Sequence, residues 1–170
     1  MIDSLIDASF SFLLAFGLPA VFVVFVFKGA IVGKPLPTSV FLPGYIFAIS
    51  ASRRTIALVV LVASLGYTCG QVLVYAIAAR WGIEGVRSLP GVTISDEQVA
   101  RSNRLFRRYS GAGIFVTNLV PYVGSFILIP AGIASYPLGR ATAYAFVSTV
   151  LNYVLIVWVV VGSVQFVAGL

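Results

Sequence analysis

The chain has 170 residues, of which 60% are hydrophobic and 9% are charged. A soluble domain usually carries about a quarter charged residues, so this composition excludes an ordinary globular surface and predicts an all-α integral membrane protein, a single domain over residues 1–170. The net charge of +6 does not indicate a nucleic-acid partner, because the basic residues stand at the ends of apolar stretches, where they can meet anionic head groups.

The first predicted element is a membrane-spanning helix over residues 8–27, which contain no charged residue. Roughly 20 such residues are needed to cross a bilayer. Gly17 and Pro19 predict a kink in this helix. Asp3 and Asp7 precede it without any Lys or Arg, which is the wrong flank for a cleaved signal peptide.

Residues 29–52 predict a re-entrant helical hairpin, which enters the bilayer and returns to the side that it came from. Pro35, Pro37 and Pro43 lie in this segment, and a proline breaks a helix because it lacks an N–H donor and clashes with the preceding turn. We expect Pro43 and Gly44 to break the hairpin. Broken backbone at membrane depth requires protein or water around it.

The second spanning helix is predicted over residues 55–79. It contains Gly66 and Gly70, whose spacing lets another helix approach closely. It also contains Cys69, the single cysteine, which cannot form an internal disulfide and is interpreted as a small buried apolar residue.

A polar segment follows and predicts an amphipathic surface helix over residues 95–109. Ser95 and Gln98 have the spacing of a capping box, in which the glutamine reaches back to the serine backbone. The pattern favours a helix lying on the membrane surface, and an ordinary solvated helix is the alternative. One predicted side carries Val99, Phe106 and Tyr109, and the other carries Arg101, Arg104 and Arg108.

A second re-entrant hairpin is predicted over residues 111–137, broken at Pro121 and Gly124, and a third spanning helix over residues 141–168. The two broken segments are similar, because residues 41–47 and 119–126 share an apolar pattern around a proline and a glycine. Paired interrupted segments point to a transport site at a repeat interface. Two unrelated kinked helices are the alternative.

The distribution of basic residues predicts the orientation of the chain. If both hairpins return to the side that they entered, the six arginines of residues 80–108 and Arg140, seven in all, share one side. The richer side is expected to be cytoplasmic, which places the N-terminus in the cytoplasm and the C-terminus outside. The opposite side holds Lys28, Lys34, Arg53 and Arg54.

Several short motifs occur in an order that resembles the DedA family, which belongs to the superfamily of VTT-domain and SNARE-associated Golgi proteins. The resemblance covers roughly residues 25–165, and its strength lies in the ordered series. In chain order the motifs are Phe41-Leu-Pro43-Gly44, Gly70-Gln71, Tyr75, Ala79-Arg80 and Gly82, Leu105-Phe-Arg-Arg-Tyr109, Pro121, Ala131-Gly132 and Pro137-Leu-Gly-Arg140.

The resemblance implies a multi-pass protein of the cell (cytoplasmic) membrane with two facing re-entrant hairpins. Members of this family are linked to the movement of lipid phosphates or phospholipids between leaflets and to membrane homeostasis. Proton-motive force is thought to matter for some of them. Under this resemblance the chain is a lipid transporter of the flippase or scramblase type.

The chain departs from the family pattern at its charged positions. Tyr45 and Gln71 replace family acids, Asn118 and Gly124 replace family arginines, and Lys28 corresponds loosely to a further acid. A charge at membrane depth costs at least ~2.5–3.5 kcal/mol unless it is paired or hydrated. Loss of the acids alone would leave buried arginines unpaired, so loss of both signs leaves a neutral site.

We therefore expect a neutral, hydrogen-bonding substrate site at the meeting point of the hairpins. Lys28, Lys34 and Arg140 are the nearest basic candidates for a phosphate, with interfacial anchoring as the alternative role for each. The neutral candidates are Tyr45, Gln71, Asn118, Tyr122 and Ser125.

The partners expected are membrane lipids, and self-association into a homo-oligomer is left open. A coupled transporter of a small solute or ion, and a non-transporting membrane scaffold, are the alternative functions. No enzyme activity, cofactor or metal is expected, because the chain has no histidine, no acidic pair in an apolar stretch and no recognisable Ser/Lys arrangement.

Overall fold

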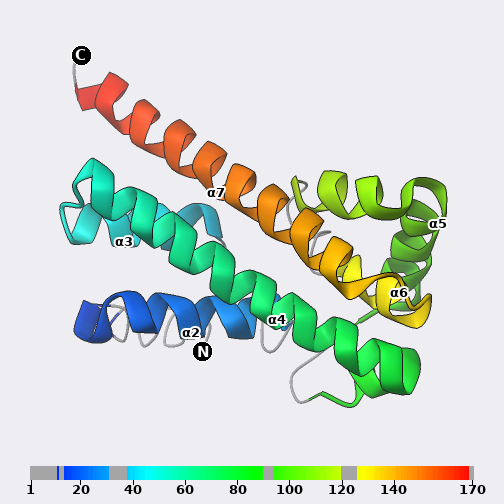
Figure 1. Cartoon of the computed structure of the whole chain (residues 1–170). Coiled ribbons are helices and arrows are strands. Elements are labelled where there is room, and N and C mark those ends of the chain that lie inside the picture. Colours follow the sequence, from blue (N-terminus) through cyan, green and yellow to red (C-terminus); the bar gives the residue numbers. More distant parts are fainter. Residues whose placement is uncertain (1–10, 12–13, 31–37, 90–93, 120–125, 169–170) are drawn as a thin grey trace.

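The computed structural model is helical throughout its regular structure, over residues 11, 14–30, 38–89, 94–119 and 126–168, the part of the chain that it describes (Figure 1). The predicted all-α class is confirmed for these residues. The helices are α2 (Leu18–Gly29), α3 (Thr38–Ala48), α4 (Arg53–Arg87), α5 (Asp96–Leu119), α6 (Leu128–Ile133) and α7 (Leu138–Ala168).

Two long apolar helices, α4 and α7, run in opposite directions through the centre of the molecule (Figure 1). Both are long and apolar enough to cross a membrane. The apolar stretch is the 35 residues of α4 in one case and 26 residues of α7 (138–163) in the other. At about 1.5 Å per residue, each exceeds the roughly 30 Å of a hydrocarbon core. These two helices correspond to the second and third predicted spans.

The first predicted span is interrupted at Gly17, where φ is 63° and ψ is −138°. This backbone conformation is open to glycine at little steric cost, and α2 begins only after it. The predicted kink is therefore confirmed, but it is sharp enough to end the helix. With 12 residues, α2 is about 18 Å long and too short to cross a bilayer alone.

The helices α2 and α3 form the two arms of a hairpin. α2 runs from one end of the molecule towards its middle, and α3 returns to the end where α4 begins (Figure 1). A Cβ atom built on Gly17, just before α2, would lie 3.9 Å from the hydroxyl of Tyr45 in α3. The first hairpin therefore includes most of the predicted first span, rather than starting at residue 29.

Pro43 and Gly44 do not break this hairpin, because both lie inside α3. A proline removes one backbone donor, and a helix packed within a bundle can continue past that single lost bond. The chain instead reverses between α2 and α3. Pro121 and Gly124, the predicted break of the second hairpin, lie outside the described residues.

The second hairpin also returns to its starting point. Its first arm is residues 111–119 of α5, separated from the preceding part of α5 by the non-helical Ser110, and its second arm is α6. A Cβ atom on Gly111 would lie 2.5 Å from the hydroxyl of Tyr136, just past α6. The hairpin therefore begins and ends at one place, from which α7 departs. The open end of this hairpin and the open end of the first hairpin lie at opposite ends of the molecule (Figure 1).

The second arms of the two hairpins, α3 and α6, end in the same type of backbone turn. After α3, the N–H of Ala51 bonds to the Ile46 carbonyl and that of Ser50 to the Phe47 carbonyl. After α6, Tyr136 and Ser135 bond to Ala131 and Gly132 in the same pattern, that of a Schellman motif. Ser50 and Ser135 have φ values of 48° and 51°. Ser50 and Ser135 therefore occupy equivalent positions in the two turns.

Glycines bring α2 and α4 into backbone contact, as the Gly66 and Gly70 spacing predicts. A Cβ atom on Gly66 would lie 2.4 Å from the Phe22 carbonyl oxygen, and one on Gly70 would lie 2.1 Å from that of Val26. Only glycine permits this approach. Cys69, between them, is exposed, so its interpretation as a buried residue is wrong: it lies on the face of α4 away from the contact.

The predicted capping box is present at the start of α5. The Ser95 N–H donates to Gln98 Oε1 at 2.9 Å, and the Gln98 N–H donates to Ser95 Oγ at 3.2 Å. The predicted faces of this helix are confirmed in part, because Phe106 is buried and the three arginines are exposed. Tyr109 is exposed, and it lies next to Ser110, where α5 bends, with the Arg108 guanidinium over its ring.

Candidate functional site

A cluster of neutral polar side chains lies between the two long helices. Gln71 Nε2 in α4 donates to Asn118 Oδ1 at 3.0 Å, although the two residues are far apart in sequence. Asn118 Nδ2 donates to Ser148 Oγ in α7 at 3.1 Å. Asn152, one turn further along α7, donates from Nδ2 to the Asn118 carbonyl oxygen at 2.7 Å. We call these four residues the polar cluster.

The secondary structure explains why these residues meet. Asn118 lies near the end of the first arm of the second hairpin, so α5 carries it into the centre of the bundle. Ser148 and Asn152 are four residues apart and therefore share one face of α7. Gln71 lies midway along α4, on its buried side. The polar cluster thus joins one hairpin to both long helices.

Three members of the polar cluster are buried, and the fourth, Asn152, is half-buried. Gln71 and Ser148 have no exposed surface and Asn118 is 5% exposed. Buried amides are stable when their donors and acceptors are paired, and Gln71 Nε2, Asn118 Oδ1 and Asn118 Nδ2 all take part in hydrogen bonds within the cluster. No member carries a charge. A ligand can reach the buried groups of Gln71, Asn118 and Ser148 only when their contacts with one another open.

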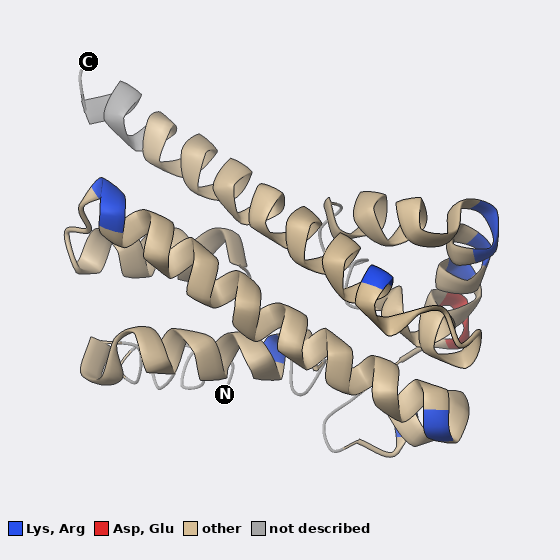
Figure 2. Cartoon of the chain, in the orientation of Figure 1, with Lys and Arg blue, Asp and Glu red and all other residues tan. Residues whose placement is uncertain are grey.

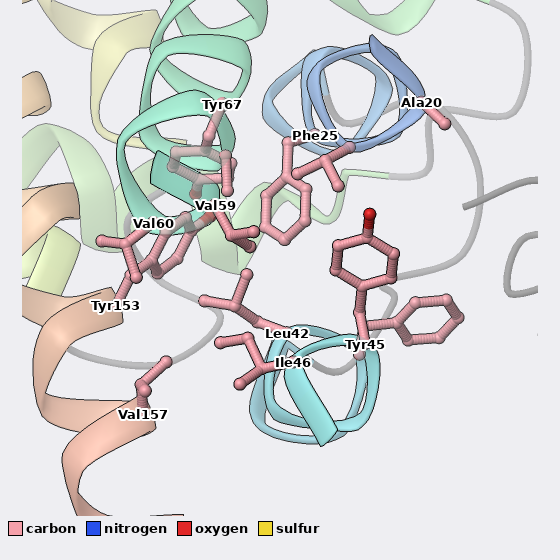
Figure 3. Close-up of a cluster of buried hydrophobic side chains, with 13 residues drawn as sticks. Ala20, Phe25, Leu42, Tyr45, Ile46, Val59, Val60, Tyr67, Tyr153 and Val157 are labelled. Atoms are coloured by element: carbon pink, nitrogen blue, oxygen red, sulfur yellow. The ribbon is translucent and has the colours of Figure 1, made fainter. Parts of the chain in front are cut away.

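Apolar clusters lie on both sides of the polar cluster. Tyr67, one turn before Gln71, belongs to a cluster formed with α2, α3 and α7 (Figure 3). Tyr75, one turn after Gln71, belongs to a cluster with α5, α6 and α7, and its hydroxyl donates to the Tyr136 carbonyl at 2.5 Å. The polar cluster is therefore flanked on both sides by apolar packing.

Lys28 lies among three aromatic rings, one from Tyr67, a turn before Gln71 in α4, and one from Tyr153, which follows Asn152 in α7. Its Nζ atom is 5.5 Å from the ring centroid of Phe25, 5.6 Å from that of Tyr67 and 5.7 Å from that of Tyr153. The three rings come from α2, α4 and α7, and all are buried, whereas Lys28 is half-buried. Within the described residues the ion pairs involve Arg87, so no carboxylate there neutralises Lys28.

The remaining predicted site residues are placed elsewhere. Tyr45 belongs to the apolar cluster and points towards α2 (Figure 3), so it does not share the hydrogen bonds of Gln71 and Asn118. Arg140 is exposed at the start of α7. Tyr122, Ser125 and Lys34 lie outside the described residues.

Sequence reasoning missed Ser148 and Asn152 in the polar cluster, and Tyr67 and Tyr153 around Lys28. One signal was available for the first two. Polar residues four apart in an uncharged spanning segment lie on one helix face, and such residues usually face protein rather than lipid. No comparable signal marks the two tyrosines, because aromatic residues are frequent throughout the chain.

Among the described residues there is no group of three or more His, Cys, Asp or Glu side chains that could hold a metal ion. The donor set of the polar cluster consists of amides and a hydroxyl, which suits hydrogen bonding to oxygen atoms of a ligand. Comparison of the chain with protein-family models, with curated proteins and with solved structures finds no match.

Proposed function

We propose that the chain is a multi-pass protein of the cell membrane that moves a phospholipid or polyprenyl phosphate between leaflets. The single observation that carries the proposal is the buried Gln71–Asn118 hydrogen bond, which joins a hairpin to a long helix at mid-length. The resemblance to the DedA family supports the same conclusion.

A membrane location is supported by the apolar outer faces of the long helices. In α7, Trp158 is 73% exposed, and Leu151, Val154 and Leu155 are also exposed. In water such a surface would be costly, whereas lipid tails solvate it. The core helix of a soluble protein would instead be covered by other helices.

The charged ends of α4 match the thickness of a bilayer. Arg53 and Arg54 begin the helix, and Arg80 stacks on the exposed Trp81 near its other end. At 1.5 Å per residue these positions lie about 40 Å apart, close to the full width of a bilayer with its head groups. Figure 2 shows basic residues at both ends of the molecule and most of them at the end formed by α5.

The two hairpins support a transport path. They enter from opposite ends, leave through the same turn and are each followed by a long helix. Transporters built from inverted repeats place their substrate site near the midplane, where interrupted helices meet. The polar cluster joins the first arm of the second hairpin to both long helices, which supports a site of this kind. Separation of Gln71 from Asn118 would make the neutral side chains of the polar cluster available for hydrogen bonds to a passing head group.

The ligand chemistry favours a phosphate-bearing head group. The oxygens of a phosphate accept hydrogen bonds from the amides of Gln71, Asn118 and Asn152, and Lys28 supplies a positive charge nearby. The polar cluster contains no carboxylate, so it offers no acid through which lipid movement could be coupled to a proton gradient. We therefore propose downhill movement.

The re-entrant arrangement predicts which residues are reached from each side of the membrane. With Cys69 replaced by serine, a cysteine at Ser110 and one at Ser135 are expected to react with an impermeant maleimide from the same side. A cysteine at Ser50 should react from the opposite side. Ser110 and Ser135 flank the second hairpin, and Ser50 follows the first. Reaction of Ser110 and Ser135 from opposite sides would show a plain crossing and exclude the hairpin.

Lipid movement is tested with the purified full chain in liposomes that contain acyl-chain-labelled phospholipids. Dithionite stays outside the liposomes and quenches labelled lipids only in the outer leaflet. We expect labelled lipids of the inner leaflet to be quenched equally fast with and without an imposed pH gradient. Asn118→Leu should slow this movement about ten-fold, since a lost hydrogen bond to a buried polar group costs about 1.4 kcal/mol. Ser163→Ala is the matched control, because Ser163 is exposed and bonds to its own helix.

The outcomes separate the alternatives. Strict dependence on the gradient would favour a coupled transporter. Equal movement by the folded Asn118→Leu variant and the parent chain would remove the polar cluster from the path. Absence of movement from the folded parent chain would favour a membrane scaffold.

A further inference from the structure

The three rings around Lys28 form a box for an ammonium group. An ammonium within about 6 Å of an aromatic centroid is attracted by the negative face of the ring, and groups of such rings recognise ammonium ligands. Here three rings from three helices lie at nearly equal distances from one Nζ atom. We call Phe25, Tyr67 and Tyr153 the aromatic box.

The box is held in place independently of Lys28. The ring of Tyr153 meets the ring of Phe25 edge to face at 5.4 Å, and it meets the ring of Tyr67 at 6.1 Å. All three rings are less than 9% exposed and belong to the same apolar cluster. The walls are therefore fixed by packing between α2, α4 and α7, whereas a lysine side chain is flexible and half-buried.

We propose that Lys28 occupies a box that also takes the ammonium of a phospholipid head group. The inference rests on the proposed function, which it sharpens by naming the head group. A phosphate that arrives at the polar cluster attracts the Lys28 ammonium out of the box. The ammonium of the same head group then replaces it, and every charge keeps a partner. A polyprenyl phosphate has no ammonium and gains nothing from the rings.

The proposal predicts selectivity between head groups. In liposomes, the full chain should move acyl-chain-labelled phosphatidylcholine faster than phosphatidylglycerol, and Tyr153→Leu should reduce the ratio of the two rates about five-fold. That factor corresponds to the contribution of one ring to cation binding. Tyr153→Phe keeps the ring and should keep the ratio. Tyr67→Leu and Tyr67→Phe repeat the comparison if Tyr153→Leu does not fold.

A binding measurement tests the box without lipid movement. In Lys28→Met the box loses its lysine, so we expect this variant in maltoside detergent to be stabilised against thermal unfolding by tetramethylammonium chloride. The tetramethylammonium concentration that gives a set rise in the unfolding temperature should be about five-fold lower for Lys28→Met than for the parent chain. It should also be about five-fold lower than for the double variant that adds Tyr153→Leu. Sodium chloride at the same concentrations is the control for ionic strength.

The ratio of lipid movement rates and the tetramethylammonium response distinguish failure of the box from failure of the proposed function. Equal responses of Lys28→Met and of the double variant to tetramethylammonium would overturn the box, whether or not lipids move. A ratio of rates that is the same in Tyr153→Leu, Tyr67→Leu and the parent chain would also overturn it. A tetramethylammonium response that requires Tyr153, in a chain that moves no lipid, would support the box and reject the proposed function.

Discussion

Gly70→Ala is expected to lower the free energy of unfolding by about 3 kcal/mol. A Cβ atom at this position would lie 2.1 Å from the Val26 carbonyl oxygen and 2.5 Å from the Ala30 nitrogen, both of them backbone atoms. Backbone cannot rotate out of the way as a side chain can, so α2 would have to move away from α4. The measurement is chemical or thermal unfolding of the purified chain in detergent.

Gly162→Ala is the matched control for this substitution. Gly162 lies in α7, and a Cβ atom there would meet no atom within 4 Å. Alanine favours a helix over glycine by about 1 kcal/mol, so this variant should be neutral or slightly more stable. Equal stability of Gly70→Ala and Gly162→Ala would contradict the close contact between α2 and α4.

The second large effect concerns the hydrogen bond between Gln71 and Asn118. Asn118→Leu removes the acceptor of Gln71 Nε2 and the donor to Ser148 Oγ, and it is expected to destabilise the chain by about 1–3 kcal/mol. Gln71→Leu should cost a similar amount, because it removes the donor to Asn118 Oδ1. Both positions are buried, so water cannot replace the lost partner.

The double variant shows whether the two side chains act as a pair. Once both are leucine, neither amide of the pair is left buried without its partner, so the double variant should be more stable than the sum of the single effects predicts, by about 1 kcal/mol. Unfolding of the four chains in one detergent gives this coupling energy. Additive effects to within about 0.3 kcal/mol would mean that the bond does not stabilise the fold.

Those features of the fold that depend on neighbouring residues were predictable from the sequence. The kink at Gly17, the capping box of Ser95 and Gln98 and the helix contact through Gly66 and Gly70 are all present. Each depends on residues within one or two turns of a single helix. The rule that a proline breaks a helix gave a wrong prediction at Pro43, because this proline lies inside α3 and does not end it.

The site was predictable only in part. Gln71 and Asn118 were expected to line one site on the strength of a family resemblance, and the structure places Gln71 Nε2 3.0 Å from Asn118 Oδ1. Tyr45 was expected beside them and instead packs in the apolar cluster with α2. Its hydroxyl suggested a polar role, but the direction of a side chain depends on which helix packs against it.

By itself, the sequence determined that the chain is helical, which stretches are apolar enough for long helices and where helices start, bend or touch, because charge, glycine and capping residues act locally. Only the tertiary structure decided that α2 and α3 form the first hairpin, that Ser148 and Asn152 complete the polar cluster and that Lys28 lies among three rings. These contacts join residues on different helices. Their physical cause is the packing of the other helices against α4 and α7, which selects the faces that meet.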